Sequence, residues 1–228
     1  VGQRGYSPKG ADRPTVVMTL HPAPPAGGPL PRWKLLTASR PCPAADPLTR
    51  FKTANKLTQI LARAEADAAG ADEALLLDGA GCAIEGSSSN LFWIREGVVC
   101  TPLVESGGLP GVTRALALEI CRALNFPTHE KACPRSELLK ADGVFLTSSA
   151  YGIVEAIALD GTAVKTSPLT RSIRNRYRHL LYTETAPPLL PAESQRSTHT
   201  NQSAVNAQGG RRSRKRDAAK RPSDAPGL

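Results

Sequence analysis

The chain has 228 residues, which is enough for one large domain or two small ones with a sizeable hydrophobic core. Its composition, with 40% hydrophobic, 21% charged and 4% aromatic residues, is typical of globular proteins. No apolar run approaches the roughly 20 residues that span a bilayer, and no basic and then apolar leader follows Val1. We therefore expect neither an integral membrane protein nor a secretory signal.

The net charge of +9 is concentrated at one end of the chain. Residues 187–228 contain eight Lys or Arg and three Asp or Glu, a net charge of +5, which leaves +4 for all other residues. This segment is poor in apolar residues, so we predict that 187–228 is a disordered basic tail. Its basic run at 211–216 is either a solvated extension or a contact for nucleic acid or an acidic partner. No aromatic residues are interleaved to stack on bases, and we expect no nucleic-acid partner outside the tail.

Cysteine and histidine residues are scattered through the chain. The five cysteines form no C-x-x-C pair, and the four histidines lie far apart. We therefore predict no metal site and no disulfide framework, and we expect a reducing, cytoplasmic location with single buried thiols. The cysteines are Cys42, Cys82, Cys100, Cys121 and Cys133.

Residues 1–50 contain two short apolar runs, at 15–20 and 33–38, separated by a Pro-rich link. Both runs are bounded by turn-forming residues, so they predict strands that lead into the following domain. From 52 to 69 the pattern is helical, because apolar residues recur at helical spacing until Gly70 ends the run. This apolar stripe consists of Ala54, Leu57, Ile60, Leu61, Ala64 and Ala68.

The rest of the domain, which we place at 51–186, mixes strands and helices. Strands are predicted at 74–77, 82–85, 91–94, 98–100, 144–147 and 153–159, and further helices at 113–124 and 167–181. The strict alternation of a doubly wound sheet is absent, so the predicted fold class is α+β.

Three segments carry residues that could bind a ligand or take part in catalysis. Lys52 precedes the first helix, where it is either solvated or a nucleophilic amine and proton carrier. Glu85 is followed by small residues, so it is either a solvent-facing side chain or an acceptor for a ligand nitrogen. The turn at 109–114 opens a helix whose free amides suit a phosphate, with Thr113 as an N-cap or an added hydroxyl. No Walker or G-x-G-x-x-G motif is present.

Taken in order, these segments and the motifs between them resemble the class IV aminotransferase family. The resemblance covers about 50–182 and implies a large pyridoxal-phosphate-binding domain with a mixed, barrel-like sheet and flanking helices. The matching stretches are Lys52 with Asn55 and Leu57, 70–75, 84–86, 90–92, 101–102, 109–114, 141–147 and 160–161.

The resemblance implies a role for each matching residue. Lys52 corresponds to the lysine that forms the Schiff base with pyridoxal 5'-phosphate and moves the proton at the substrate Cα. Glu85 corresponds to the acid that bonds the pyridine nitrogen, which keeps the ring able to withdraw electrons. Val112 and Thr113 correspond to the turn that holds the phosphate. Substrate contacts are implied for Ser148, Ser149 and Ala150, with Ser149 also near the phosphate, and for Arg4 and Tyr6 before the first strand.

Within the family, the segments around Lys52, Arg4 and Asn90 look most like 4-amino-4-deoxychorismate lyase, which releases pyruvate and leaves 4-aminobenzoate for folate synthesis. A branched-chain or D-amino-acid aminotransferase is the alternative, and a homodimer is implied in either case. The family's N-terminal domain has no counterpart before Arg4. A third hypothesis is therefore a truncated, non-catalytic remnant with a basic tail.

Overall fold

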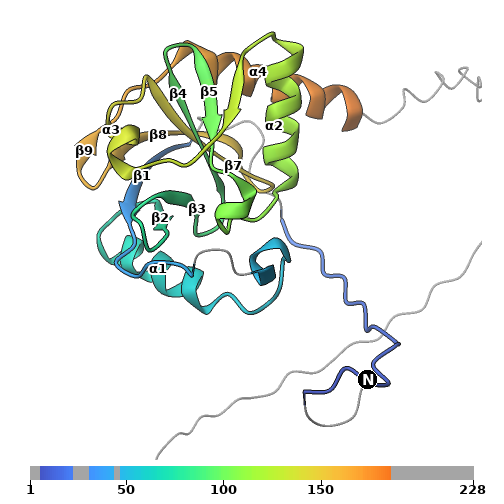
Figure 1. The fold of residues 1–228 in the computed structure, drawn as a ribbon. Helices are drawn as coiled ribbons and strands as arrows, with labels where there is room; N and C mark the ends of the chain where they lie inside the picture. The colour runs from blue at the N-terminus through green and yellow to red at the C-terminus, as the bar shows by residue number, and fades with distance from the viewer. Residues whose placement is uncertain (1–5, 23–30, 44–46, 186–228) are drawn as a thin grey trace, which may run out of the picture. The chain divides into compact units, whose positions relative to one another are not determined.

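The structure, a computed structural model, describes residues 6–22, 31–43 and 47–185 (Figure 1). None of the helices in these ranges is long and apolar enough to cross a membrane. The helices are η1 (Pro47–Arg50), α1 (Leu57–Ala68), η2 (Val104–Ser106), α2 (Val112–Ala123), α3 (Arg135–Leu139) and α4 (Pro168–Thr185). The strands are β1 (Arg32–Thr37), β2 (Glu73–Leu77), β3 (Ala83–Gly86), β4 (Asn90–Arg95), β5 (Val98–Thr101), β6 (Thr128–Glu130), β7 (Gly143–Ser148), β8 (Gly152–Leu159) and β9 (Thr162–Ala163).

The strands of the described residues form one mixed sheet in the order β3-β2-β1-β8-β7-β4-β5-β6, with β9 paired to β8. Strand β1 runs parallel to both of its neighbours, β2 and β8, whereas β4 and β7 pair antiparallel. The segment 1–50 therefore supplies a central strand of this sheet. The mixed pairing confirms the α+β class.

Side chains alternate between the two faces of the sheet with the period of two that strands impose. In β4, Phe92 and Ile94 pack under α2 and α4, whereas Leu91 and Trp93 face the core beneath α3. Phe145 of β7 stacks on Phe92 with 4.8 Å between ring centroids, which joins the two central strands beneath α2 and α4. Helix α1 covers β1 and β2 with small residues, Ala62 and Ala66.

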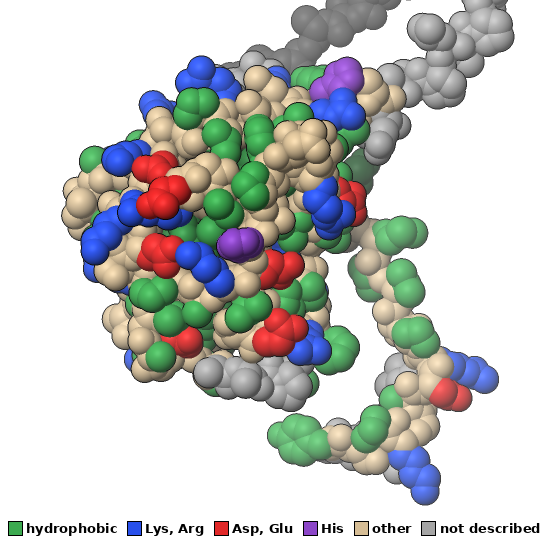
Figure 2. Space-filling view, turned by 45° about the horizontal axis from the view of Figure 1, so that its top comes forward, with side chains coloured by type: hydrophobic (Ala, Val, Ile, Leu, Met, Phe, Trp, Pro, Cys, Tyr) green, Lys and Arg blue, Asp and Glu red, His purple; other side chains and the backbone are tan. Residues whose placement is uncertain are grey.

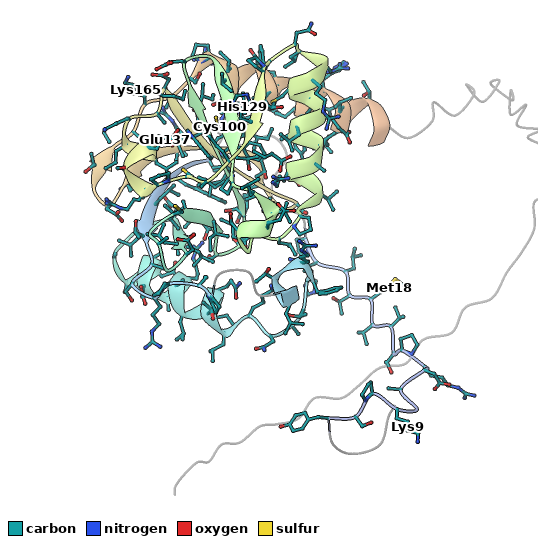
Figure 3. The ribbon with its side chains drawn as sticks, in the orientation of Figure 1. Lys9, Met18, Cys100, His129, Glu137 and Lys165 are labelled. Carbon is teal, nitrogen blue, oxygen red and sulfur yellow. The ribbon has the colours of Figure 1, made fainter. Side chains whose placement is uncertain are left out.

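Most of the elements predicted from the sequence are present within one or two residues of their expected ends. The first helix differs, because it begins at Leu57 and leaves Lys52 in the loop before it. The prediction of a strand at 15–20 is wrong: this run forms no strand and its large side chains are exposed. A strand needs a hydrogen-bonded neighbour, and none of the described strands pairs with this run. Figure 3 labels Met18 within it.

The helix α1 also differs in the direction of its apolar stripe. The apolar stripe identified in the sequence is exposed on the helix, including Leu57 (63%) and Ile60 (62%). The sheet instead contacts Ala62 and Ala66, because the close approach of α1 to β2 leaves room only for small side chains. Five short elements were not expected from the sequence, namely η1, η2, β6, α3 and β9. The predicted tail at 187–228 lies outside the described residues.

Candidate functional site

A hollow of about 980 Å³ opens between α1, the end of β3, the start of α2 and the loop after β7. It collects side chains and backbone from four separate stretches of the chain. Its lining residues are Arg50, Lys52, Lys56, Gln59, Ile60, Arg63, Ala64, Asp67, 85–90, 109–113 and 147–151.

Glu85 lies on the β3 side of the hollow, where its carboxylate is largely removed from water. Its Oε2 accepts a hydrogen bond from the Leu109 amide (2.8 Å) and a longer one from Asn90 Nδ2 (3.3 Å). Burial raises the pKa of Glu85 to about 7, although the Leu109 amide and the nearby Lys56 and Lys52 act to lower that pKa. A carboxyl group that titrates near neutrality is suited to share a proton with a ligand nitrogen.

The start of α2 forms the opposite wall and presents backbone amides. The first hydrogen bond of this helix runs from the Ala115 amide to the Gly111 carbonyl (3.0 Å), so the amides of 112–114 have no acceptor within the helix. The N-cap is Gly111, which places Thr113 inside the first turn and leaves the capping role expected for it to Gly111. Free amides and the positive end of the helix dipole together favour an anion here.

Asn90 connects these two walls. Its Nδ2 donates to the Leu109 carbonyl (2.7 Å) as well as to Glu85, so one side chain ties the turn at 109–111 to β4. A Cβ built on Gly111 would collide with Oδ1 of Asn90. Glycine at this position therefore allows the turn to approach β4 closely.

The end of β7 and the loop after it supply hydroxyl groups to the same hollow. Thr147 is buried and lines the hollow, and its Oγ1 has no hydrogen-bond partner within the described part of the chain. Ser148 accepts a hydrogen bond from the Tyr151 amide (3.2 Å), whereas Ser149 and Ala150 are exposed. An unpartnered buried hydroxyl in a cavity wall points to a polar ligand group at that place.

Cationic side chains surround the rim of the hollow. Lys52 is exposed and Lys56 is half-buried. Arg63 is engaged with Asp67 through a 2.8 Å hydrogen bond on α1. The remaining arginine of the lining, Arg50, lies 3.9 Å from Glu105 across exposed surface.

Most of the residues predicted for the site line this hollow, and Tyr6 does not. Lys52, Glu85, Val112, Thr113 and the loop residues 148–150 all line it. Tyr6 is fully exposed and is not part of the lining. Arg4 lies outside the described residues.

Sequence reasoning missed two lining residues, Thr147 and Asn90, and a buried carboxylate beside the hollow, Glu73. Asn90 and Thr147 stood inside recognised motifs, but only the structure shows that they face the hollow. Glu73 is an acidic residue in an otherwise apolar strand, EALLL, and that interruption was an available signal.

A second cluster of polar side chains lies around Glu137, outside the hollow. Trp93 Nε1 and Lys131 Nζ both donate to Glu137 Oε1, at 3.1 and 2.7 Å. Figure 3 places Glu137 and the neighbouring Cys100 in the part of the molecule away from α1.

No group of three or more potential metal ligands occurs among the residues that the structure describes. Figure 2 shows Lys and Arg interspersed with Asp and Glu, so the face it presents has no block of one sign.

Comparison with known proteins assigns the chain to a family. The family profile described as amino-transferase class IV matches residues 1–159. This chain is a member of the class IV aminotransferase family. A Methanocaldococcus jannaschii protein, described provisionally as a branched-chain-amino-acid aminotransferase, is 28% identical over 183 residues, which are 79% of this chain and 64% of that protein. The D-alanine aminotransferase of Bacillus licheniformis is 32% identical over 139 residues, 60% of this chain and 49% of the enzyme.

A solved structure of the same family confirms the fold. The Legionella pneumophila protein described provisionally as a 4-amino-4-deoxychorismate lyase matches with a TM-score of 0.62 and 30% identity, over 68% of this chain and 57% of that one. The chain therefore spans about half to two thirds of the length of these class IV relatives. Class IV aminotransferases depend on pyridoxal phosphate.

The hollow has the groups that this cofactor requires. Its amides at 112–114 and the unpartnered Thr147 hydroxyl suit a phosphate, and Glu85 suits a pyridine nitrogen. The amines of Lys52 and Lys56 line the same space. The residues present therefore fit pyridoxal phosphate.

Proposed function

We propose that this chain is the cofactor-binding part of a pyridoxal-phosphate enzyme that acts on small amino compounds. The observation that carries the proposal is the single hollow in which Lys52, Glu85, the start of α2 and the loop at 147–150 meet. These stretches are distant in sequence, so their convergence reflects the fold and not local chain order.

Each wall has a separate task in this proposal. The α2 amides and Thr147 bind the phosphate, while Glu85 holds a proton at the pyridine nitrogen. Lys52 holds the cofactor and transfers the proton at the substrate Cα. When bound, the cofactor supplies the electron sink that makes that Cα proton acidic. Ser148, Ser149 and Ala150 are proposed to contact the substrate carboxylate, and Arg4 is proposed as a further substrate contact.

The proposal is tested by absorbance titration of the full chain with pyridoxal phosphate. A new band at the edge of the visible range is expected for the unaltered chain and is expected to be lost in Lys52→Ala. Lys165→Ala is a matched control, because Lys165 pairs with Asp142 and is not part of the lining (Figure 3). Borohydride reduction and peptide mapping should place the label on Lys52 and not on Lys56, the other lysine of the hollow.

A band that is absent from the folded, unaltered chain would contradict the proposal. It would leave the third hypothesis, a non-catalytic remnant with a basic tail. Label on Lys56 would contradict the role assigned to Lys52.

The first candidate activity is that of a 4-amino-4-deoxychorismate lyase, which would place the protein in folate synthesis. The motifs around Lys52 and Asn90 and the likeness to the Legionella protein support it. The second candidate is an aminotransferase for branched-chain or D-amino acids, which the two curated relatives favour.

One assay separates these two activities. A lyase releases pyruvate from aminodeoxychorismate with no keto acid added, whereas an aminotransferase converts its amino donor only when a keto-acid acceptor is present. Pyruvate release without an acceptor, lost in Lys52→Ala, is the expected result for the lyase. Turnover that requires the acceptor would replace the lyase with the aminotransferase.

We also propose that the protein forms a homodimer in the cytoplasm. The exposed apolar stripe of α1 supports self-association, because contiguous exposed apolar side chains are typical of interfaces. The cysteines support a reducing location, because the five are scattered along the sequence and form no C-x-x-C pair.

A further inference from the structure

Glu73 is a completely buried carboxylate beside the hollow, at the start of β2. Six hydrogen bonds converge on its two oxygens, and five of them come from three consecutive serines. Ser87 donates through its amide (3.1 Å) and its hydroxyl, Ser88 through its amide (3.3 Å) and hydroxyl (2.8 Å), and Ser89 through its hydroxyl (3.1 Å). The sixth donor is the Ala74 amide at 2.9 Å.

We propose that Glu73 is a positioning residue that holds the serine loop, residues 87–89, as a fixed wall of the hollow next to Glu85. The part of this inference that concerns cofactor binding rests on the proposed function. The part that concerns the loop and Glu85 does not depend on it.

The first reason is that the backbone amides of the serine loop need hydrogen-bond acceptors. Strand β3 ends at Gly86. The Ser87 amide still donates to the Ala74 carbonyl of β2 (2.9 Å) and shares its hydrogen with Glu73, whereas the Ser88 amide has left the ladder and needs another acceptor. Glu73 faces this turn from the neighbouring strand and accepts from the amides of Ser87 and Ser88. Every partner of Glu73 acts as a donor, which is the pattern that a carboxylate satisfies and a carboxamide of the same shape does not.

The second reason is the closeness of the loop to this carboxylate. A Cβ built on Gly86 would collide with the Ser89 hydroxyl and would lie 3.1 Å from Cγ of Glu73. The loop is thus drawn over Glu73 so tightly that only glycine fits at its base. All three serines and Gly86 line the hollow, so a displacement of this loop changes the shape of the ligand space.

The third reason is the charge environment of Glu85. The groups that act on Glu85 are Lys56 and Lys52 from the segment before α1, the Leu109 amide, and Glu73 from β2. Burial is the main cause of its raised pKa, and the negative charge of Glu73 raises that pKa further. Cys42, beyond β1, faces the same carboxylate, and its own pKa is raised by burial first and by Glu85 second. Removing the charge of Glu73 should therefore lower the pKa of Glu85.

The test uses the full chain without cofactor and compares Glu73→Gln with the unaltered protein. Glutamine keeps the shape but replaces one acceptor oxygen with a donor. Amide hydrogen exchange at Ser88 is expected to accelerate by roughly tenfold or more, because its charged hydrogen bond is lost. A smaller acceleration is expected at Ser87, because its amide keeps the Ala74 carbonyl as an acceptor. The pKa of Glu85, followed by carboxyl carbon NMR and assigned with Glu85→Gln, is expected to fall below its original value of about 7.

Two further variants separate charge from packing. Ser88→Ala removes one hydroxyl donor and keeps the carboxylate, so it should accelerate exchange by a smaller factor and leave the pKa of Glu85 in place. Glu65→Gln is the matched control. Glu65 also accepts from a serine amide and hydroxyl, those of Ser39 at 2.8 Å each, but it is not part of the lining, so neither readout should change.

Unchanged exchange in Glu73→Gln, or an unchanged pKa of Glu85 with accelerated exchange, would overturn the inference. If Glu73→Gln does not fold, exchange of the residue 88 amide in Ser88→Ala, corrected for the intrinsic exchange rate, decides: acceleration supports the inference, and no change overturns it. In folded Glu73→Gln, pyridoxal phosphate titration should show a dissociation constant raised by about tenfold. Failure of the unaltered chain to bind pyridoxal phosphate would contradict the proposed function and leave the exchange and pKa results standing.

Discussion

Glu85 illustrates how a single carboxyl group is tuned by opposing effects. Removal from water favours its neutral form, whereas the Leu109 amide and two lysines favour the ionised form. Burial prevails, and the pKa is raised from 4.5 to about 7. Near neutral pH the group is consequently divided between its two forms, which suits it to exchange a proton with a basic ligand nitrogen.

This tuning predicts a pH dependence of stability. Because the folded-state pKa of Glu85 is raised, the folded chain binds more protons than the unfolded chain between about pH 4.5 and 7. The free energy of unfolding should therefore fall as the pH rises through this window, by about 1 to 3 kcal/mol. Urea unfolding at roughly pH 5 and pH 8 should show this loss for the unaltered chain but not for Glu85→Gln. The same decrease in both proteins would show that other groups cause it.

At the scale of elements, the start of α2 is positioned by its contact with β4. Asn90 of β4 holds the Leu109 carbonyl, and Gly111 leaves space for that side chain. Arg114, in the first turn of the helix, donates to the Pro102 carbonyl (3.1 Å) and also pairs with Glu130. Contacts on both sides of the first turn thus fix the direction of α2, so the positive end of its dipole points toward the hollow.

The contact between Gly111 and Asn90 can be tested by replacing Gly111 with alanine, which adds one methyl group. Gly111→Ala places a Cβ against Asn90, so the turn must shift, and we expect a loss of about 1 to 3 kcal/mol in the free energy of unfolding. Gly79→Ala is the matched control, because no heavy atom lies within 4 Å of its added Cβ. Thermal and urea unfolding of both variants measure the difference. Equal stability of the two variants would contradict the close approach that the structure shows.

The elements of the sheet were predictable from sequence because their residues alternate or form short apolar runs between turns. Strands such as β4, NLFWIR, are buried on both faces, and their apolar runs are unmistakable. The run at 15–20 has the same local character but has no paired neighbour among the described strands. Local propensity indicates that a segment can be a strand, and only tertiary pairing makes it one.

The candidate site was predictable only in part, for a related reason. The residue types at positions 52, 85 and 112–113 matched motifs of a known family, and the structure places these residues around one hollow. The roles of Asn90 and Thr147 depend on which face of a strand meets the cavity, which a motif does not specify. The spacing of apolar residues predicted the helix α1, but it does not reveal that Ala62 and Ala66, and not the leucines, pack against β2.

At the scale of the whole molecule, the apolar face of α1 lies beside the mouth of the hollow. Ile60 belongs both to this face and to the lining, while Leu57 and Leu61 belong to the face alone. The polar and apolar groups of the site are thus continuous with an exposed apolar surface. Large exposed apolar side chains that are contiguous are uncommon in monomers, so this surface is where a second copy of the chain should bind.

Self-association through α1 can be measured by sedimentation velocity over a range of concentrations. We expect a monomer–dimer equilibrium whose dissociation constant rises by about tenfold or more in Leu57→Glu, since each copy would lose a buried leucine contact. Thr58→Glu introduces the same charge at the neighbouring exposed position and is expected to have a smaller effect. A monomer at every concentration, or equal weakening by the two substitutions, would contradict an interface formed by the apolar stripe. In the first case the stripe would face solvent, and in the second the added charge alone would account for the change.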